Sequence, residues 1–381
     1  MMYKIKSQGN FRPFSQPRSI VKVNSIVVPF RTWDVSLNGY AAADIFNLTC
    51  PFRILDSLKG VTDLVNTPDK STILLTQPDI LVETYAGYPK DPNNYTVDDL
   101  TQLMYGYLDT VDFYLDDQGE RVQIAGRNQV GPFMDTKTTD KFPNQTSSTI
   151  VIMFATQQGL QTEVTPTYTM AGTYYDSDHV QLTTDITQWD LMNYLAQQEG
   201  FTLRVVGNTL FFGPRDSFLK STAIPYTWGQ NIKSLHLGRT PHASKDIKVE
   251  VITWQPGKKT RIVATATNPT SYAKKVTGTS AHQEWVETYY LPGLTRDQAQ
   301  QRAQAILDQL SQSEIVGDLT ADGNDQQDIY QPIQLYGTGL GLTQQYWPTK
   351  VDHSFDHQSG KYGMTLNFSN LNMPATNPGG V

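Results

Sequence analysis

Alternating apolar and polar residues fill several segments near both ends of the chain, and this pattern constrains the fold more than any other feature. Residues 20–28 predict a β-hairpin that turns at Asn24-Ser25, and residues 80–88 predict a strand. Residues 105–115 predict a second long strand, from which a tight turn leads to a strand over residues 121–127. Successive strands joined by tight turns form a meander, the usual basis of a barrel or a sandwich.

The last third of the chain returns to strands and contains one helix. The alternating segments that predict strands are residues 247–254, 260–266, 333–336, 346–355 and 362–368. Thr295 and Gln298 have the spacing of a capping box, which predicts that a helix begins there. A single apolar stripe follows at helical spacing, made of Ala299, Ala303, Ile306, Leu307 and Leu310.

The middle of the chain has a different pattern. Residues 135–148 are rich in Thr, Lys, Asn and Ser and predict a linker. Thr187, with Asp190 three residues later, predicts the start of a helix that ends at Gly200. Residues 201–212 then predict a hairpin. These segments together predict a small α+β module.

The whole pattern predicts a mainly β fold with an α+β insertion. Residues 41–48 allow a strand or a short helix, of which we favour the strand. The expected order is an N-terminal arm (1–17), a first strand-rich domain (18–145), the middle α+β module (146–235), a second strand-rich domain with one helix (236–371) and a flexible tail (372–381).

The charge and the cysteine content narrow the classes of function. A net charge of −7 argues against a dedicated nucleic-acid binder, because neutralising phosphates requires clustered Lys and Arg. The N-terminus lacks the apolar stretch of a signal peptide. The sequence contains no run of 18 apolar residues, so we expect no membrane span. Cys50 is the one cysteine, so no intramolecular disulfide forms, and we expect a buried apolar group rather than a nucleophile.

Three motifs that suggest chemistry each lack an essential residue. His353 and His357 have the spacing of a zinc-binding helix, but Ser354 stands where the catalytic Glu belongs, and on a strand the rings lie about 13 Å apart. Residues 322–328 lack the glycine and the distal Glu of a calcium loop, so we expect a solvated turn. Residues 337–341 lack the Lys of a phosphate loop. We therefore predict no catalytic, cofactor-binding or metal-binding residues and no enzymatic activity.

Three stretches in order resemble one known family. They are residues 20–127 with Gly106-Tyr107-Leu108-Asp109-Thr110-Val111, residues 185–212 with the helix after Thr187, and residues 295–355 ending in Trp347-Pro348-Thr349-Lys350-Val351-Asp352-His353-Ser354-Phe355. Their order and spacing resemble the baseplate hub proteins of contractile-tailed bacteriophages, a late-control-D-like family that includes the phage Mu hub. The resemblance covers most of residues 18–370.

This resemblance implies a specific architecture and assembly. Each protomer of such a hub carries two β-barrel domains similar to the tail-tube fold, here residues 18–145 and 236–371. Three protomers then form a homotrimeric, nearly sixfold ring around a channel, located in the tail baseplate of the virion after assembly in the host cytoplasm. The implied partners are the central spike, the tail tube or distal tube protein, the baseplate wedge proteins and the tape measure protein, with DNA only as passing cargo and no membrane.

A second interpretation is a tail-associated protein that binds or degrades cell-wall carbohydrate. The chain contains 20 Tyr and 6 Trp, and aromatic rings stack on sugars. Hydrolysis would in addition need two carboxylates in a cleft. The sequence places no such pair.

Overall fold

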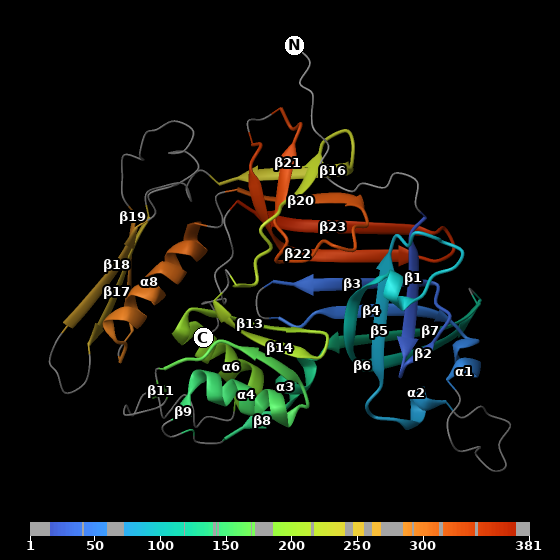
Figure 1. The fold of residues 1–381 in the computed structure, drawn as a ribbon, viewed down its shortest axis with the longest axis horizontal. Helices are drawn as coiled ribbons and strands as arrows, with labels where there is room; N and C mark the ends of the chain where they lie inside the picture. Colours follow the sequence, from blue (N-terminus) through green and yellow to red (C-terminus); the bar gives the residue numbers. More distant parts are fainter. Residues whose placement is uncertain are drawn as a thin grey trace.

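A computed structural model describes residues 16–39, 42–58, 72–117, 119–139, 142, 145–168, 170–171, 186–214, 217–240, 247–254, 261–267, 285–291, 293–311, 315–339 and 342–370 (Figure 1). The predicted arm lies almost entirely outside these residues, and the predicted tail lies wholly outside them. No helix within the described ranges has the length and apolar character needed to cross a membrane.

Strands from both ends of the chain form one large sheet. The N-terminal strands are β1 (Arg18–Val23), β2 (Ile26–Val27), β3 (Thr32–Asn38), β4 (Ile45–Pro51), β5 (Leu81–Gly87), β6 (Thr101–Asp116) and β7 (Gly119–Asn128). The C-terminal strands are β15 (Ile224–Thr227), β16 (Ile232–Arg239), β20 (Ile315–Asp322), β21 (Ile333–Tyr336), β22 (Gln345–Asp356) and β23 (Lys361–Ser369). The fold is mainly β, as predicted.

The two halves of this sheet meet at strands β3 and β22. These strands pair antiparallel from Thr32 opposite Asp356 to Asn38 opposite Lys350. Trp33 stacks on Phe355 at the junction, with ring centroids 5.9 Å apart, and both side chains are buried. One hydrophobic core runs under both halves, so the sheet packs as a single unit.

The halves repeat the same order of strands. In the N-terminal half the neighbours run β3-β4-β7-β6-β5, and in the C-terminal half they run β16-β20-β23-β22-β21. Every adjacent pair in both series is antiparallel. The outermost strands differ, because β1 pairs antiparallel with β5 whereas β15 pairs parallel with β21.

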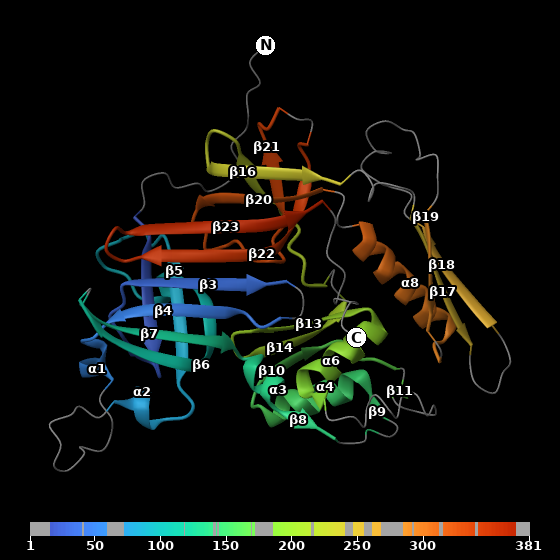
Figure 2. The ribbon, with the colours of Figure 1, turned by 180° about the vertical axis from the view of Figure 1, so that it is seen from behind.

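A second core belongs to the middle of the chain, which in Figures 1 and 2 lies below the C-terminal strands β22 and β23 and beside β6 and β7. Its helices are α3 (Gly131–Asp135), α4 (Ser147–Gln157) and α6 (Gln188–Glu199). Its strands are β8 (Lys137–Thr138), β9 (Gln145–Thr146), β10 (Gln161–Val164), β11 (Met170–Ala171), β12 (Ile186–Thr187), β13 (Phe201–Val206) and β14 (Thr209–Pro214). Short helical turns α1 (Ile54–Ser57), α2 (Ile73–Thr76) and η1 (Val97–Asp99) lie between strands of the first half.

A third core lies in a unit inserted between β16 and β20. Strands β17 (Ile247–Trp254), β18 (Arg261–Thr267) and β19 (Trp285–Tyr290) form a sheet that packs on helix α8 (Arg296–Ser311). Ala299, Ala303, Ile306 and Leu307 of the predicted apolar stripe are buried there. The expected strand-rich domain over residues 236–371 thus contains this separate unit, and the expected domain boundaries remain a proposal.

Several local predictions are confirmed. Asn24 and Ser25 have positive φ angles of 46° and 66°, as a tight hairpin turn requires. Thr187 caps α6 by accepting a hydrogen bond from the Asp190 amide at 3.0 Å, and Gly200 ends it in the left-handed region. The favoured strand over residues 41–48 is present as β4, shifted toward Pro51.

The predicted linker over residues 135–148 is wrong in part. It contains β8, β9 and the first residues of α4. Thr146 caps α4, whose buried side includes the polar Ser147 and Ser148, whereas its exposed side includes the apolar Ile152. A helix of this kind has little amphipathic periodicity, so its apolar residues show neither the helical nor the alternating spacing by which the other elements are predicted.

The contact between Trp33 and Phe355 yields a stability prediction. Phe355→Ala removes a buried ring that also lies 6.0 Å from those of Phe30 and Tyr362, so we expect a loss of about 3–5 kcal/mol in the free energy of unfolding. Chemical denaturation measures this loss. Val316→Ala, at a side chain that is 44% exposed, is the control and should change stability by less than about 0.5 kcal/mol. A loss below about 1 kcal/mol for Phe355→Ala would contradict the assignment.

Candidate functional site

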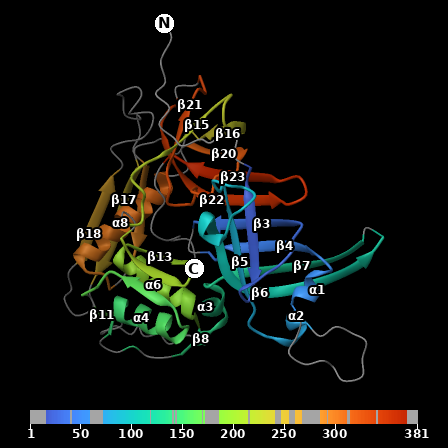
Figure 3. The ribbon, with the colours of Figure 1, turned by 45° about the vertical axis from the view of Figure 1, so that its right-hand side comes forward.

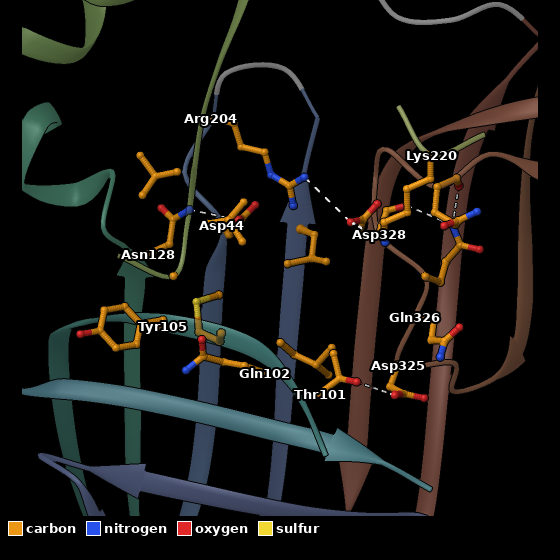
Figure 4. Close-up of a pocket in the computed structure, with 18 residues that line it drawn as sticks. Asp44, Thr101, Gln102, Tyr105, Asn128, Arg204, Lys220, Asp325, Gln326 and Asp328 are labelled. Carbon is orange, nitrogen blue, oxygen red and sulfur yellow. Dashed lines mark hydrogen bonds and ion pairs between the residues drawn. The ribbon is translucent and has the colours of Figure 1, made fainter. Parts of the chain in front are cut away.

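Three segments that are distant in sequence meet beside the junction of the two half-sheets. They are the ends of β4, β6 and β7, the hairpin strand β13, and the loop of residues 323–331. A pocket of about 380 Å³ lies between them, lined by residues that include Asp44, Thr101, Asn128, Arg204, Lys220 and Asp328 (Figure 4). Its polar groups therefore come from all three parts of the chain.

Asp44 is held by the N-terminal half of the sheet. Its carboxylate accepts hydrogen bonds from the Asn38 amide at 2.7 Å and from the Asn128 side chain at 3.0 Å. Desolvation raises the pKa of Asp44 to about 6, although the positive charge of Arg204 and these hydrogen bonds act in the opposite direction. Asp44 is thus a carboxyl group whose charge changes in the mildly acidic range.

Arg204 connects the middle module to the C-terminal loop. Its guanidinium lies over the Tyr330 ring at 4.5 Å from the centroid and 3.9 Å from the Asp328 carboxylate. Asp328 also pairs with Lys220 at 3.3 Å. Because the Arg204 side chain is 18% exposed, water screens these contacts only in part.

The loop of residues 323–331 is also held by the N-terminal half. The Thr101 hydroxyl donates a hydrogen bond to Asp325 at 2.6 Å, and the Tyr88 hydroxyl donates one to the Gly323 carbonyl at 2.8 Å. Asp322 pairs instead with Lys233 of β16. The run of residues 322–328, predicted to be a solvated turn, is therefore a docked loop whose carboxylates diverge toward different partners.

A buried polar network lies behind this loop. His353 of β22 is fully buried, and its Nδ1 accepts a hydrogen bond from the Tyr362 hydroxyl at 3.0 Å. Its Nε2–H donates to the Gln327 carbonyl at 3.2 Å, which fixes the neutral tautomer. Burial lowers the pKa of His353 to about 4. His357 lies beyond the end of β22 with its ring 5.1 Å from Phe30, so the two histidines do not converge.

The structure also shows the surroundings of the other residues that the sequence analysis considered for chemistry. Cys50 is buried in the main core, and burial raises the pKa of its thiol to about 12, which suppresses the nucleophilic thiolate. Gly337 and Gly339 adopt positive φ in the connection from β21 to β22, which leads into a strand rather than a helix. The described residues contain no group of three His, Cys, Asp or Glu side chains placed to hold a metal ion.

The site therefore consists of side chains that bridge segments. Arg204, Asp328 and Thr101 fix the middle module and the 323–331 loop against the sheet. The sequence analysis does not identify these residues. Arg204 gives one usable signal, because a charged residue in the largely apolar run of residues 201–206 must find a partner when the strand is buried.

His353 should make stability depend on pH. The unfolded chain binds a proton with the ordinary pKa near 6.5, whereas the folded chain binds it only near pH 4. Between these values the unfolded state holds more protons, so acidification should remove up to about 3 kcal/mol of stability. Denaturation at a series of pH values should show a flatter slope for His353→Gln. Equal slopes for the wild-type protein and His353→Gln would contradict the prediction.

Arg204 should control the ionisation of Asp44. Because the positive charge lowers the pKa of this carboxyl group, Arg204→Gln should raise that pKa above its present value of about 6. Carboxyl carbon chemical shifts followed by NMR during a pH titration measure the change. Arg261→Gln, at an exposed arginine in the inserted unit, is the control and should leave the titration unchanged. An unchanged or lower pKa in Arg204→Gln would contradict the geometry.

Comparison with solved structures identifies the fold. The structure is similar to a tail protein from Neisseria meningitidis MC58, with a TM-score of 0.67, 11% identity, and coverage of 94% of this chain and 98% of that one. It is also similar to a 43 kDa tail protein of prophage MuSo2 from Shewanella oneidensis, with a TM-score of 0.64, 14% identity, and coverage of 94% and 99%.

A third similar structure comes from a secretion system. It is an E. coli component of the type VI secretion system, described as similar to the T4 bacteriophage tail proteins gp27 and gp5, with a TM-score of 0.52, 9% identity, and coverage of 93% and 76%. No family model matches the chain, and a search of curated proteins finds no match. At these identities the comparison establishes the fold alone: the chain has the fold of phage tail proteins.

Proposed function

We propose that the chain is the structural hub of a phage tail baseplate, and that three copies form a ring around a central channel. The observation that carries this proposal is the repeated strand order of the two half-sheets. Three copies of a chain with two similar halves present six similar units around a threefold axis. Such a ring can meet a sixfold tube on one face and a threefold spike on the other.

The fold comparisons support this role. Two similar structures that cover nearly the whole chain are described as tail proteins, and a third is described as resembling T4 tail proteins. We propose as partners the central spike, the tail tube or distal tube protein, the baseplate wedge proteins and the tape measure protein of a contractile tail. The protein would act in the virion, after assembly in the host cytoplasm, with DNA passing through the channel and no enzymatic step.

The mass of the assembly tests the proposal. Size-exclusion chromatography with light scattering should give three times the chain mass for the chain alone, or three chain masses plus the mass of the bound partner after addition of the tube or spike protein. Projection images should show a ring with near-sixfold symmetry. A monomer in all of these mixtures that clears cell-wall substrate would contradict the hub and favour the carbohydrate-degrading interpretation.

A further inference from the structure

Half of strand β6 has an open edge. Residues Thr101 to Tyr107 pair with β5, and the Leu108 amide still donates to the Ile80 carbonyl at 3.0 Å. From Thr110 to Asp116 the strand pairs with β7 on one side, and no described strand pairs with it on the other. Figure 3 shows this part of the hairpin projecting from the body. Alternate backbone N–H and C=O groups therefore point outward, where another strand can pair.

Strand β22 shows how the same edge is used in the other half. It pairs with β21 through Tyr346, has a bulge between Pro348 and Lys350, and then pairs with β3 from Lys350 to Asp356. Strand β6 pairs with β5 through Tyr107, has a bulge between Leu108 and Thr110, and then runs open from Thr110 to Asp116. Both strands thus have a first partner, then a bulge and then a further segment, and in β6 this last segment has no second partner among the described strands.

Strand β16 is the counterpart of β3. It pairs with β20 as β3 pairs with β4, and its other edge has no strand partner among the described residues. It lies at the end of the sheet farthest from the N-terminal strands (Figure 2). A single chain therefore carries one open copy of each member of the β3–β22 junction.

We propose that β16 of a neighbouring copy pairs with Thr110–Asp116 of β6 as β3 pairs with β22 within the chain. This inference rests on the proposed ring and names the strands through which its copies meet. The pairing β6-β7-β4-β3 in the N-terminal half corresponds to the pairing β22-β23-β20-β16 in the C-terminal half. When the two series are matched residue by residue, Asp116 of β6 corresponds to Asp356 of β22, and Ser234 of β16 corresponds to Thr32 of β3. The register then places Asp116 opposite Ser234, and Tyr114 opposite His236.

The side chains suit this register. In the proposed pairing, Leu115 would lie opposite Leu235 of the neighbouring copy, and Phe113 would lie opposite its Leu237. Phe113, Leu235 and Leu237 are half-buried against the main core, whereas Leu115 is 68% exposed in the single chain. Pairing would cover Leu115 with apolar surface and continue the core between copies.

Charge favours the same partner. Residues 109–121 contain five acidic side chains, Asp109, Asp112, Asp116, Asp117 and Glu120, against one basic residue, Arg121. Strand β16 has no acidic residue, and its Lys233 and His236 contact Asp322 and Asp318 of β20. Pairing of two β6 edges would bring like charges together, whereas pairing with β16 would not, so charge favours the pairing of β6 with β16.

Cysteine cross-linking tests the register. Asp116→Cys chains mixed with Ser234→Cys chains under mild oxidation should form a disulfide, because opposite residues in a sheet lie within bonding distance. The matched control replaces Asp116→Cys by Asp112→Cys, which is also an exposed aspartate on the same face but lies about 13 Å farther along the strand. We expect at least ~10-fold more cross-linked product in the first mixture. Cys50 is buried and does not compete.

The two mixtures give a decision in every case. More product with Asp116→Cys supports the inference, whereas equal or absent product in both mixtures overturns it. If neither mixture is favoured but light scattering of the wild-type chain still shows a trimer, the proposed function stands and only the interface is wrong.

A chain that carries both Asp116→Cys and Ser234→Cys tests the threefold ring separately, and its cross-linked products should end at three copies. A longer series would support the strand pairing and contradict the threefold ring.

Discussion

The antiparallel pairing of β3 with β22 is the constraint on which the rest of the structure depends. It joins strands about 300 residues apart in the sequence and places the stacked Trp33 and Phe355 rings over a core shared by both halves. The cost of closing so long a chain segment rises only slowly with its length, so a well-packed junction can offset it. Once the junction forms, the remaining strands on either side extend the same sheet outward.

The contacts beside this junction are polar because three segments must hold their orientation there. Arg204 brings a charge from the middle module, and Asp328 and Thr101 anchor the same loop to different elements. Behind the loop, burial keeps His353 neutral, and Tyr362 and the Gln327 carbonyl satisfy its two ring nitrogens. A buried polar group such as His353, whose hydrogen-bond partners are both present, fixes one arrangement of the segments, whereas apolar contacts alone tolerate sliding.

The sequence predicts the elements with strong periodicity, such as β5, β6, α6 and α8, because their signals are local. Strand β3 also alternates, with Trp33, Val35 and Leu37 buried, but the strand prediction does not include it. Helix α4 is missed because it buries Ser147 and Ser148 and exposes Ile152, which weakens its amphipathic pattern. The pairing of β3 with β22 and the partners of Arg204 depend on which distant strands become neighbours, and no pattern within one segment specifies that.

The unit of β17–β19 and α8 enters and leaves the sheet at adjacent points, since Arg239 of β16 lies opposite Ile315 of β20. Its entry and exit are therefore already held together by the sheet, and its apolar side chains pack on a core of their own. A block attached in this way can change in length or be exchanged for another without moving the strands on either side. Related chains are accordingly expected to diverge most at this point while keeping the flanking sheet intact.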